Sequence, residues 1–476
     1  MSPPLVSPAR YASTTPPAAG FLDGARRALT GSADTPLVLL GNFEVEDEWA
    51  KGESGLPALA GRGSAALVNR MDEFALLLAG PRDHVVLKSP PDPDHLEHLA
   101  SLGIALPAVL VTDVQDPAHS VTVDALRSPR LLAALRELGR QGARLLPHGQ
   151  SALEDELCAL TGLASALPPS PLVKSVNSKI YSRRLAAELG LPLARGWECG
   201  TIGEFEAAAG EAARLCLEQG RRIGVKDAFG VSGKGIAVLD DSRRLHQLVR
   251  MVARGAARRG DDRVSLVIEE WADKVTDLNY HFTVGLDGRV RFDFVKEALT
   301  ENGVHKGHRF PARLPAEHTA AVTEAAARIG ERLAADGFHG VVGVDAMVTR
   351  DRGLLPVLEI NARNNMSTYQ TSLQERFMRP GTVALARQYE LSPASPVSFA
   401  RLRDRLGDLL LDPVTGRGLI VNNFATVNAA ATTAGPDGRR WNGRLYGLLL
   451  ARSAAELTAY DRAVTDAVRK ETHPDD

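Results

Sequence analysis

Two carboxylates and one amide stand where their side chains could bind a metal ion. Asp345 interrupts the apolar run Val341–Val348, and Glu359 and Asn361 alternate at the end of the next run, Leu354–Asn361. Because side chains alternate along a strand, Glu359 and Asn361 point to the same face. If the two runs are neighbouring strands, all three side chains converge. Oxygen donors of this kind are those that Mg²⁺ accepts beside triphosphate oxygens, so we predict a magnesium site here.

An acid inside an apolar strand is costly to bury unless its charge is neutralised. For Asp345 or Glu359 taken alone, the alternative is an ion pair with Arg363 or another base. The pattern of three oxygen donors on two consecutive strands favours the metal.

A glycine-rich segment supplies a second candidate site. Lys226 ends a predicted strand, Arg222–Lys226, and the loop that follows contains Ser232, Gly233 and Gly235 before a return strand. Backbone N–H groups in such a loop can approach phosphate closely. The spacing fits neither the P-loop nor the dinucleotide-binding fingerprint. A plain structural turn is the alternative, and the lysine directly before the loop favours a phosphate site.

Mixed helical and strand patterns surround these residues. Between Thr35 and Pro171 short apolar runs alternate with helical spacing, which predicts a separate α/β segment. The strands expected there are Leu37–Leu40, Val85–Leu87 and Pro107–Val111, and the helices are Ser128–Gly139 and Ser151–Leu163.

The central part of the chain is predicted to alternate in the same way. Asp287-Gly288 is a strong hairpin signal. It places Phe282, Val284 and Leu286 on one face, matched across the turn by Val290, Phe292 and Phe294. The elements expected are the helices Asn177–Leu189 and Ala316–Asp336 and the strands Ser265–Glu270, His281–Leu286, Arg289–Val295, Leu419–Asn422 and Leu445–Leu450.

Bulk properties narrow the classes of function. The 476 residues suffice for two or three domains, and the net charge of −2 argues against a large nucleic-acid-binding surface. Three scattered cysteines indicate neither disulfides nor a zinc site and suit the cytoplasm. No apolar run is long enough to span a membrane, and the proline-rich start lacks the core of a signal peptide. We expect a disordered tail over residues 1–30.

The order of these motifs resembles the ATP-grasp superfamily over residues 172–380. The motifs are a helix with Asn177 and Lys179, strand-ending Lys226 with its glycine-rich loop, the run 267–271 (Val-Ile-Glu-Glu-Trp), Asp345, and Glu359-x-Asn361. The resemblance implies two α+β lobes that grip ATP.

The resemblance also implies roles for individual residues. Asp345, Glu359 and Asn361 would hold two Mg²⁺ ions, for which Mn²⁺ can substitute, and Arg363 would stabilise charge on the transferring phosphoryl group. The residues assigned to ATP are Lys179 and Lys226 at the α- and β-phosphates, Ser232, Gly233 and Gly235 over the triphosphate, Glu269, Glu270 and Trp271 at adenine, and Asp277 at ribose. From the residues alone, a solvated helix face for Lys179 and core packing for Trp271 stay open.

A narrower resemblance covers nearly the whole chain. The run 39–46 (Leu-Leu-Gly-Asn-Phe-Glu-Val-Glu) is similar to the pre-ATP-grasp domain of peptide ligases from natural-product clusters. Residues 421–425 and 443–447 are similar to the carboxyl-terminal domain of the same ligases. The expected architecture is α+β: a pre-ATP-grasp α/β domain over 31–171, an ATP-grasp core over 172–380, and a smaller α+β domain over 381–476.

A basic cluster follows the predicted hairpin: His305, Lys306, His308 and Arg309. Arg309 is the member best suited to bind a carboxylate or phosphate, because its guanidinium bonds in bidentate fashion. We predict a catalytic role for Arg309 beside Lys226 and Arg363. A solvated loop is the alternative.

The expected activity is ATP-dependent joining of a small carboxylate to an amine or peptide through an acyl phosphate, in peptide antibiotic biosynthesis. Three alternatives stay open at this point: a carrier-protein thiol or protein side chain as acceptor, a phosphotransferase on the same fold, and a non-catalytic ATP-binding regulator. The sequence names neither substrate. It also leaves the oligomeric state open, with a homodimer as one option.

Overall fold

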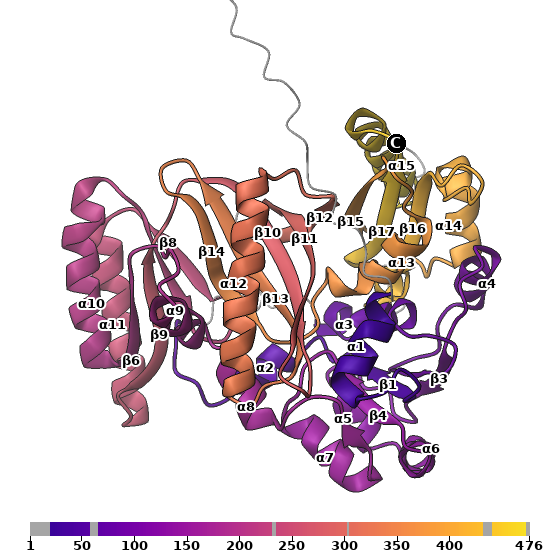
Figure 1. Ribbon diagram of the computed structural model, residues 1–476, viewed down its shortest axis with the longest axis horizontal. Coiled ribbons are helices and arrows are strands. Elements are labelled where there is room, and N and C mark those ends of the chain that lie inside the picture. The colour runs from indigo at the N-terminus through magenta and orange to yellow at the C-terminus, as the bar shows by residue number, and fades with distance from the viewer. Residues whose placement is uncertain (1–19, 58–64, 231–234, 302–303, 432–439, 473–476) are drawn as a thin grey trace, which may run out of the picture.

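Three β-sheets form the frame of the protein, and helices cover their outer faces (Figure 1). The computed structural model describes residues 20–57, 65–230, 235–301, 304–431 and 440–472. The mixed α+β architecture predicted from the sequence is confirmed.

The amino-terminal part forms a five-stranded parallel sheet in the order β3-β2-β1-β4-β5. Its short apolar runs are those of strands buried on both faces. The strands are β1 (Leu37–Leu40), β2 (His84–Leu87), β3 (Ala108–Val111), β4 (Arg144–Pro147) and β5 (Ala164–Ser165). One face packs on α5 (Val121–Leu126), α6 (Pro129–Arg140) and α7 (Ala152–Thr161). The other face packs on α1 (Phe21–Thr30) and η1 (Met71–Leu77).

Helix α1 corrects the expectation of a disordered tail that reaches residue 30. Phe21, Ala25 and Leu29 are spaced by four residues and are buried on one stripe of the helix. Arg26, which is also buried, donates to Asp83 beside the start of β1. The burial of this stripe stabilises a helix that polar and proline-rich flanks do not suggest. Residues 1–19 of the expected tail lie outside the described residues.

A four-stranded antiparallel sheet forms the lobe at the left of Figure 1, in the order β6-β9-β7-β8. Its strands are β6 (Gly196–Thr201), β7 (Ile223–Asp227), β8 (Ile236–Leu239) and β9 (Arg263–Glu270). Helices α10 (Ile202–Leu215) and α11 (Ser242–Arg259) cover one face, and their apolar residues form a core of their own with the sheet.

The largest sheet has eight strands in the order β14-β13-β10-β11-β12-β15-β17-β16. They are β10 (Lys274–Val284), β11 (Val290–Glu301), β12 (Val304–Phe310), β13 (Gly340–Thr349), β14 (Gly353–Asn361), β15 (Val383–Leu391), β16 (Gly418–Asn423) and β17 (Gly443–Ala451). Strand β15 pairs with β12, so the carboxyl-terminal strands continue the sheet of the core. The predicted domain boundary near residue 380 therefore falls within a continuous sheet.

A β-bulge changes the predicted faces of the hairpin. His281 is opposite Phe294, and the next residue, Phe282, is opposite Phe292, so Asp293 is the extra residue. Phe292 packs in the core beneath α12, whereas Phe294 packs on the opposite face with α1. The strict alternation expected from the sequence is wrong at Phe294, because one extra residue inverts the face of those that follow.

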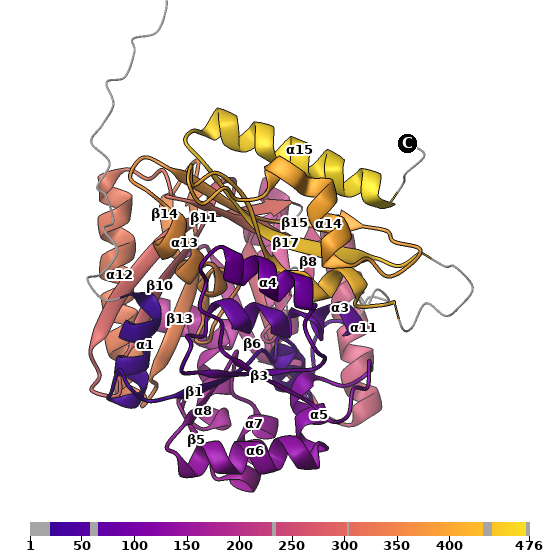
Figure 2. The same ribbon diagram turned by 90° about the vertical axis from the view of Figure 1, so that its right-hand side faces the viewer.

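Among the remaining helices, α15 (Ala454–Thr472) packs across β15 and β17 of the large sheet (Figure 2). The helices near the candidate active site, which is described below, are α2 (Val45–Ala50), α8 (Ser170–Val176), α9 (Lys179–Glu188) and η3 (Thr368–Gln370). The others are α3 (Ala65–Val68), α4 (Pro93–Ser101), η2 (Leu217–Gln219), α13 (Thr371–Phe377), α14 (Phe399–Leu406), η4 (Gly407–Leu409) and η5 (Ala425–Asn428).

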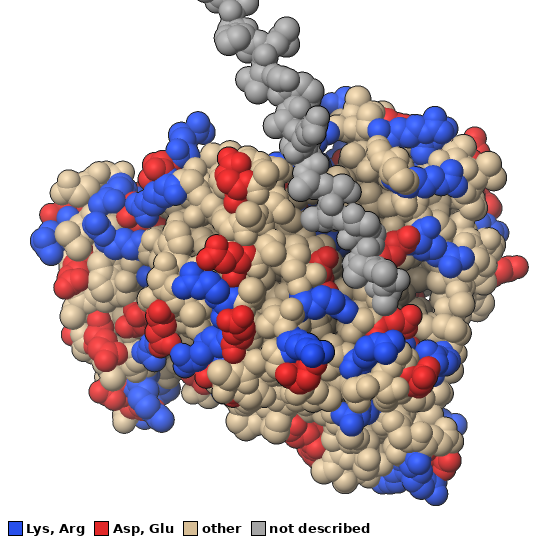
Figure 3. All heavy atoms as spheres, in the orientation of Figure 1, with Lys and Arg blue, Asp and Glu red and all other residues tan. Residues whose placement is uncertain are grey.

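Positive and negative side chains are interspersed on the face seen in Figure 3. That distribution agrees with a net charge of −2 and with the absence of a basic stripe on this face. None of the described helices is long and apolar enough to cross a membrane.

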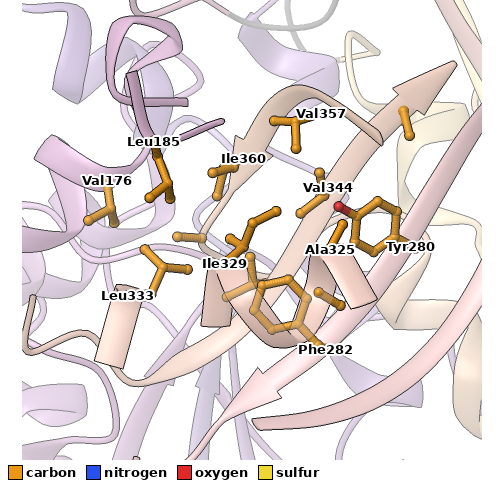
Figure 4. Packing of buried hydrophobic residues seen from close by; sticks show 14 of the residues in the cluster. Val176, Leu185, Tyr280, Phe282, Ala325, Ile329, Leu333, Val344, Val357 and Ile360 are labelled. Atoms are coloured by element: carbon orange, nitrogen blue, oxygen red, sulfur yellow. The ribbon is translucent and has the colours of Figure 1, made fainter. Parts of the chain in front are cut away.

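The core of the large sheet lies between its strands and α12 (Ala316–Ala335). Figure 4 shows Ile329 and Leu333 of this helix packed beside Phe282 and Ile360. Ile360 separates Glu359 from Asn361 in β14. Packing of the apolar face therefore fixes the direction of the polar side chains on the other face.

We expect Ile329→Ala to lower the free energy of unfolding by about 2–5 kcal/mol, because the fully buried side chain leaves a cavity. Urea denaturation followed by circular dichroism measures the change. Leu286→Ala is the control, since that side chain is 49% exposed and its loss should cost less than about 1 kcal/mol. Equal losses in the two variants would contradict the assignment of the core.

Candidate active site

The two predicted acids lie directly opposite each other on neighbouring strands. Asp345 in β13 and Glu359 in β14 are register partners, and Asn361 is opposite Gly343 one step along the same face. Asn361 Nδ2 donates to Asp345 Oδ2 over 3.2 Å. The predicted convergence of Asp345, Glu359 and Asn361 is therefore present.

Asp345 carries a charge that its direct partners do not neutralise. Its carboxylate accepts hydrogen bonds from two amides, Asn279 Nδ2 at 2.8 Å and Asn361 Nδ2 at 3.2 Å. Burial and the facing Glu359 carboxylate together raise the pKa of Asp345 to about 6. A further positive charge at this point would stabilise the ionised pair.

Two predicted cations reach the same place from different elements. Lys179 of α9 is buried, and its Nζ lies 2.6 Å from Glu359 Oε1 and 3.3 Å from the carbonyl oxygen of Gly230. Burial favours the neutral amine, but Glu359 outweighs it and raises the pKa of Lys179. Arg363 Nη2 donates to Asn361 Oδ1 over 2.9 Å and also to Glu46 of α2.

A second group of predicted residues lies on the four-stranded sheet. Lys226 pairs with Glu269, whose other oxygen is 3.0 Å from Arg183 Nη1. Lys226 Nζ lies 5.8 Å from the centroid of the Trp271 ring. The ring packs against Gly224, where a β-carbon would come within 2.9 Å of Trp271. The bare glycine thus leaves room for an indole beside Lys226.

The glycine-rich loop is only partly within the described residues. Ser232 and Gly233 lie outside them. Gly235 has φ of +74°, a conformation that favours glycine, and its carbonyl oxygen accepts from the backbone N–H of Asp227 over 2.8 Å. At the other end, the Gly230 carbonyl is held by Lys179. Gly230, at the start of the loop, therefore lies beside Lys179 and the acid pair.

The catalytic role expected for Arg309 is corrected by the strand register. Arg309 is opposite Glu297, which is opposite Leu278, whereas Asp345 is opposite Asn279. Neighbouring residues of a strand point to opposite faces, so Arg309 lies on the face away from Asp345. Its guanidinium is bound there by Glu297 at 3.2 Å.

Two other predicted ATP contacts have protein partners instead. Glu270, at the end of β9, is buried and pairs with Arg221, which precedes β7, and with Arg352, which precedes β14, so these ion pairs link the two sheets. Its side chain therefore has a structural role that the sequence did not indicate. Asp277 pairs with Lys274 Nζ at 2.6 Å, on the same face as Asn279 but one row further from the acids.

The expected basic cluster is also corrected. Burial lowers the pKa of His305 to about 4 and that of His308 well below its usual value, so both rings are neutral near pH 7. The rings lie 4.3 Å apart between centroids, and Lys306 faces Glu390. These residues do not form a single cationic site.

Three further residues belong to the site. Asn279 binds Asp345, and its own oxygen lies 2.7 Å from Ser367 Oγ. Arg183 holds Glu269, and Glu46 holds Arg363. The sequence contained signals for two of them: Asn279 alternates with Asp277 and His281 along one strand, and Arg183 stands one helical turn after Lys179. The Glu46–Arg363 contact joins residues 317 apart and had no local signal.

The donor set fits a divalent cation bound together with a triphosphate. Two carboxylates and one amide are too few for a protein cage, and Mg²⁺ commonly takes one or two carboxylates plus phosphate oxygens and water. Among the described residues, no group of three or more His, Cys, Asp or Glu could hold a metal ion alone. Asp345, Glu359 and Asn361 could hold the ion once ATP supplies the remaining ligands.

Comparisons with known proteins agree with this architecture. A family model described as the Pre ATP-grasp domain matches residues 71–163. In structure, the chain is similar to a biotin carboxylase from Campylobacter jejuni, with a TM-score of 0.52, 12% identity and 91% of each chain covered. It is also similar to N5-carboxyaminoimidazole synthase from Aspergillus clavatus, with a TM-score of 0.50, 13% identity, and 91% of this chain and 98% of that chain covered. These likenesses show that the chain shares the fold of these enzymes.

Two of the relatives in sequence are named as ligases, and others are named as formate-dependent phosphoribosylglycinamide formyltransferases, one of them from Corynebacterium efficiens. The [butirosin acyl-carrier protein]–L-glutamate ligase of Niallia circulans is 26% identical over 68% of this chain and 71% of the relative. The L-propargylglycine–L-glutamate ligase of Streptantibioticus cattleyicolor is 26% identical over 74% of this chain and 77% of the relative. The chain is thus similar to ligases over most of its length and contains a match to the Pre ATP-grasp domain, so the resemblance predicted from its motifs is confirmed.

The raised pKa of Asp345 predicts that metal binding depends on pH. A metal ion must displace the proton that Asp345 holds below about pH 6. We expect Mg²⁺ with a non-hydrolysable ATP analogue to raise the melting temperature strongly at pH 7.5 and much less at pH 5. Differential scanning fluorimetry measures this shift, with EDTA in place of Mg²⁺ as the control at each pH. An equal shift at both values would contradict the assignment.

Proposed function

We propose that the protein is an ATP-dependent carboxylate–amine ligase that forms an amide through an acyl phosphate and releases ADP and phosphate. The observation that carries this proposal is the facing pair Asp345–Glu359, with Lys179 and Arg363 beside it. Such an arrangement can neutralise a triphosphate and a second anion at one point.

In this proposal ATP lies between the four-stranded and eight-stranded sheets. Lys226 and Lys179 bind its phosphates, and Ser232, Gly233 and Gly235 are the loop residues proposed to contact the triphosphate. Trp271 and the main chain of Glu269 and Glu270 hold the adenine, and Asp277 lies toward the ribose. Lys179 and Lys226 at present bind Glu359 and Glu269. Phosphate oxygens would replace or share these partners.

The chemistry needs no nucleophilic side chain. A carboxylate oxygen of the substrate attacks the γ-phosphorus of ATP, the bond to the bridging oxygen breaks, and ADP leaves. The amine nitrogen then attacks the acyl carbon, loses a proton, and inorganic phosphate leaves. Arg363, held by Asn361 and Glu46, lies where it can bind the carboxylate and the acyl phosphate. Mg²⁺, when bound by Asp345, Glu359 and Asn361, would neutralise charge on the transferred phosphoryl group.

The substrates proposed are a small amino-acid-like carboxylate and an amine or peptide, in the cytoplasm where ATP is available. Both ligase relatives are named for joining L-glutamate, and one of them acts on propargylglycine. These names support a role in the biosynthesis of a peptide natural product, including antibiotics.

The first test supplies the purified protein with ATP, Mg²⁺ and a panel of carboxylates and amines, and resolves ADP from AMP. We expect ADP, phosphate and a new amide mass. Glu359→Ala should lower the rate by at least about 100-fold, because it removes one of two charged metal ligands. Glu331→Ala, on the exposed side of α12, is the matched control and should keep the rate. Formation of AMP and pyrophosphate would contradict the acyl-phosphate route.

A carrier-protein acceptor is the second candidate, because one relative is named as an acyl-carrier-protein ligase. The same acyl phosphate would then be attacked by the thiol of the carrier's prosthetic group. We expect the intact mass of a holo carrier protein to rise by one acyl group and to return to its original value after neutral hydroxylamine treatment. A carrier that stays unmodified while free amines react would exclude this candidate.

A further inference from the structure

A pocket opens where the amino-terminal domain meets the acid pair. Glu46 and Trp49 of α2 line one side, and Glu359 and Asn361 of β14 line another. Asn177, Phe229 and Gly230 complete the lining. Helix α2 belongs to the segment before the ATP-grasp core and lies beneath the large sheet in Figure 1. The amino-terminal domain therefore contributes side chains directly to the reaction site.

Glu46 is held firmly in this position. Its neighbours Val45 and Trp49 are buried in the core of the large sheet, and Trp49 Nε1 donates to the carbonyl oxygen of Gln150 over 2.9 Å. Glu46 itself is 12% exposed and accepts from Arg363. It is not one of the predicted metal ligands. Its carboxylate thus lies in the lining of the reaction site, outside the metal set, and accepts from Arg363.

The side chains that line this pocket favour the binding of a positively charged group. Its charged members among the described residues are two acids, Glu46 and Glu359, and its aromatic members are Trp49 and Phe229. The cations that pair with these acids, Arg363 and Lys179, are not among the residues of the lining, so a group inside the pocket meets the carboxylates first. An ammonium can bond to Glu46 and is attracted by the faces of the aromatic rings. The pocket therefore suits the ammonium end of a substrate.

Arg363 links this pocket to the reacting centre. Its Nη2 contacts both Glu46 and Asn361 Oδ1. In an α-amino acid a single carbon separates the ammonium from the carboxylate. An ammonium on Glu46 would therefore bring the carboxylate of the same molecule beside Arg363 and the acid pair, where phosphoryl transfer is proposed.

We infer that Glu46 binds the α-ammonium of the carboxylate substrate, so that the donor is an amino acid with a free amino group. This inference rests on the proposed function and names the substrate class of the same site. An N-acylated or des-amino acid would lack the charge that Glu46 recognises. Glu46 thus acts as a specificity-determining residue, while phosphoryl transfer depends on the groups already described.

The test replaces the unknown amine by hydroxylamine and measures hydroxamate and ADP. The carboxylates supplied are the twenty proteinogenic L-amino acids, their N-acetyl derivatives and their des-amino counterparts. For the amino acid that reacts best, we expect kcat/KM to exceed that of its des-amino counterpart by about 10- to 100-fold, the range for a hydrogen bond to a charged group. Glu46→Gln should remove most of this preference by lowering kcat/KM for the amino acid alone.

Two further variants separate recognition from structural support. Glu48→Gln makes the same change on the same helix, where the acid pairs with the exposed Lys51, and should behave as the wild type. Glu46→Asp keeps the charge and should keep the preference. Melting temperatures of all variants check that they fold. If Glu46→Gln lowers kcat/KM equally for the amino acid and its des-amino counterpart, Glu46 only supports Arg363 and the inference is wrong.

The other outcomes are also decisive. Equal use of N-acetyl, des-amino and free amino acids by the wild type would overturn the inference and leave the ligase proposal standing. An increase in KM for hydroxylamine alone in Glu46→Gln would move Glu46 to the acceptor side and likewise overturn it. The absence of ADP with every carboxylate would contradict the proposed function itself, and the inference with it.

Discussion

The mutual repulsion of Asp345 and Glu359 is the constraint on which the rest of the site depends. The two acids face each other across neighbouring strands, and the partners of Asp345 are neutral amides. Like charges so placed are destabilising unless cations surround them. Lys179 supplies one positive charge and Arg363 lies nearby. The facing carboxylates thus lower the stability of the fold. They create a site where a further positive charge, and with it a polyphosphate, binds favourably.

Packing of the large sheet holds this arrangement in place. Ile360, between Glu359 and Asn361, is anchored in the core beneath α12, and Val344 and Ala346 flank Asp345 in the same core. Because side chains alternate along a strand, Asp345 and Glu359 then point to the opposite face of the sheet, where the site lies. Two cations come from outside this sheet, Lys179 from α9 and Lys226 from the four-stranded sheet. Arg363 follows β14 and is held by Glu46 of the amino-terminal domain. The site exists only when three parts of the chain are assembled.

Sequence reasoning succeeded where a local pattern carries the information. Hydrophobic alternation located β13 and β14, and with them Asp345, Glu359 and Asn361. It failed where contacts between distant parts of the chain determine the position or the charge of a side chain. The extra residue Asp293 inverted the face of Phe294, and register placed Arg309 on the wrong side of the sheet for catalysis. Burial, which no spacing reveals, turned His305 and His308 into neutral side chains. The contact between Glu46 and Arg363 depends on the packing of two domains.

The central claim is that a substrate carboxylate attacks the γ-phosphorus of ATP, and oxygen isotope transfer tests it directly. A reacting carboxylate labelled with ¹⁸O in both oxygens would be incubated with ATP, Mg²⁺ and an amine, and the released phosphate analysed by mass spectrometry. The account predicts one ¹⁸O atom in each inorganic phosphate, because the acyl phosphate keeps a carboxylate oxygen when the amine displaces it. Label in AMP, or amide formation with unlabelled phosphate, would contradict the account.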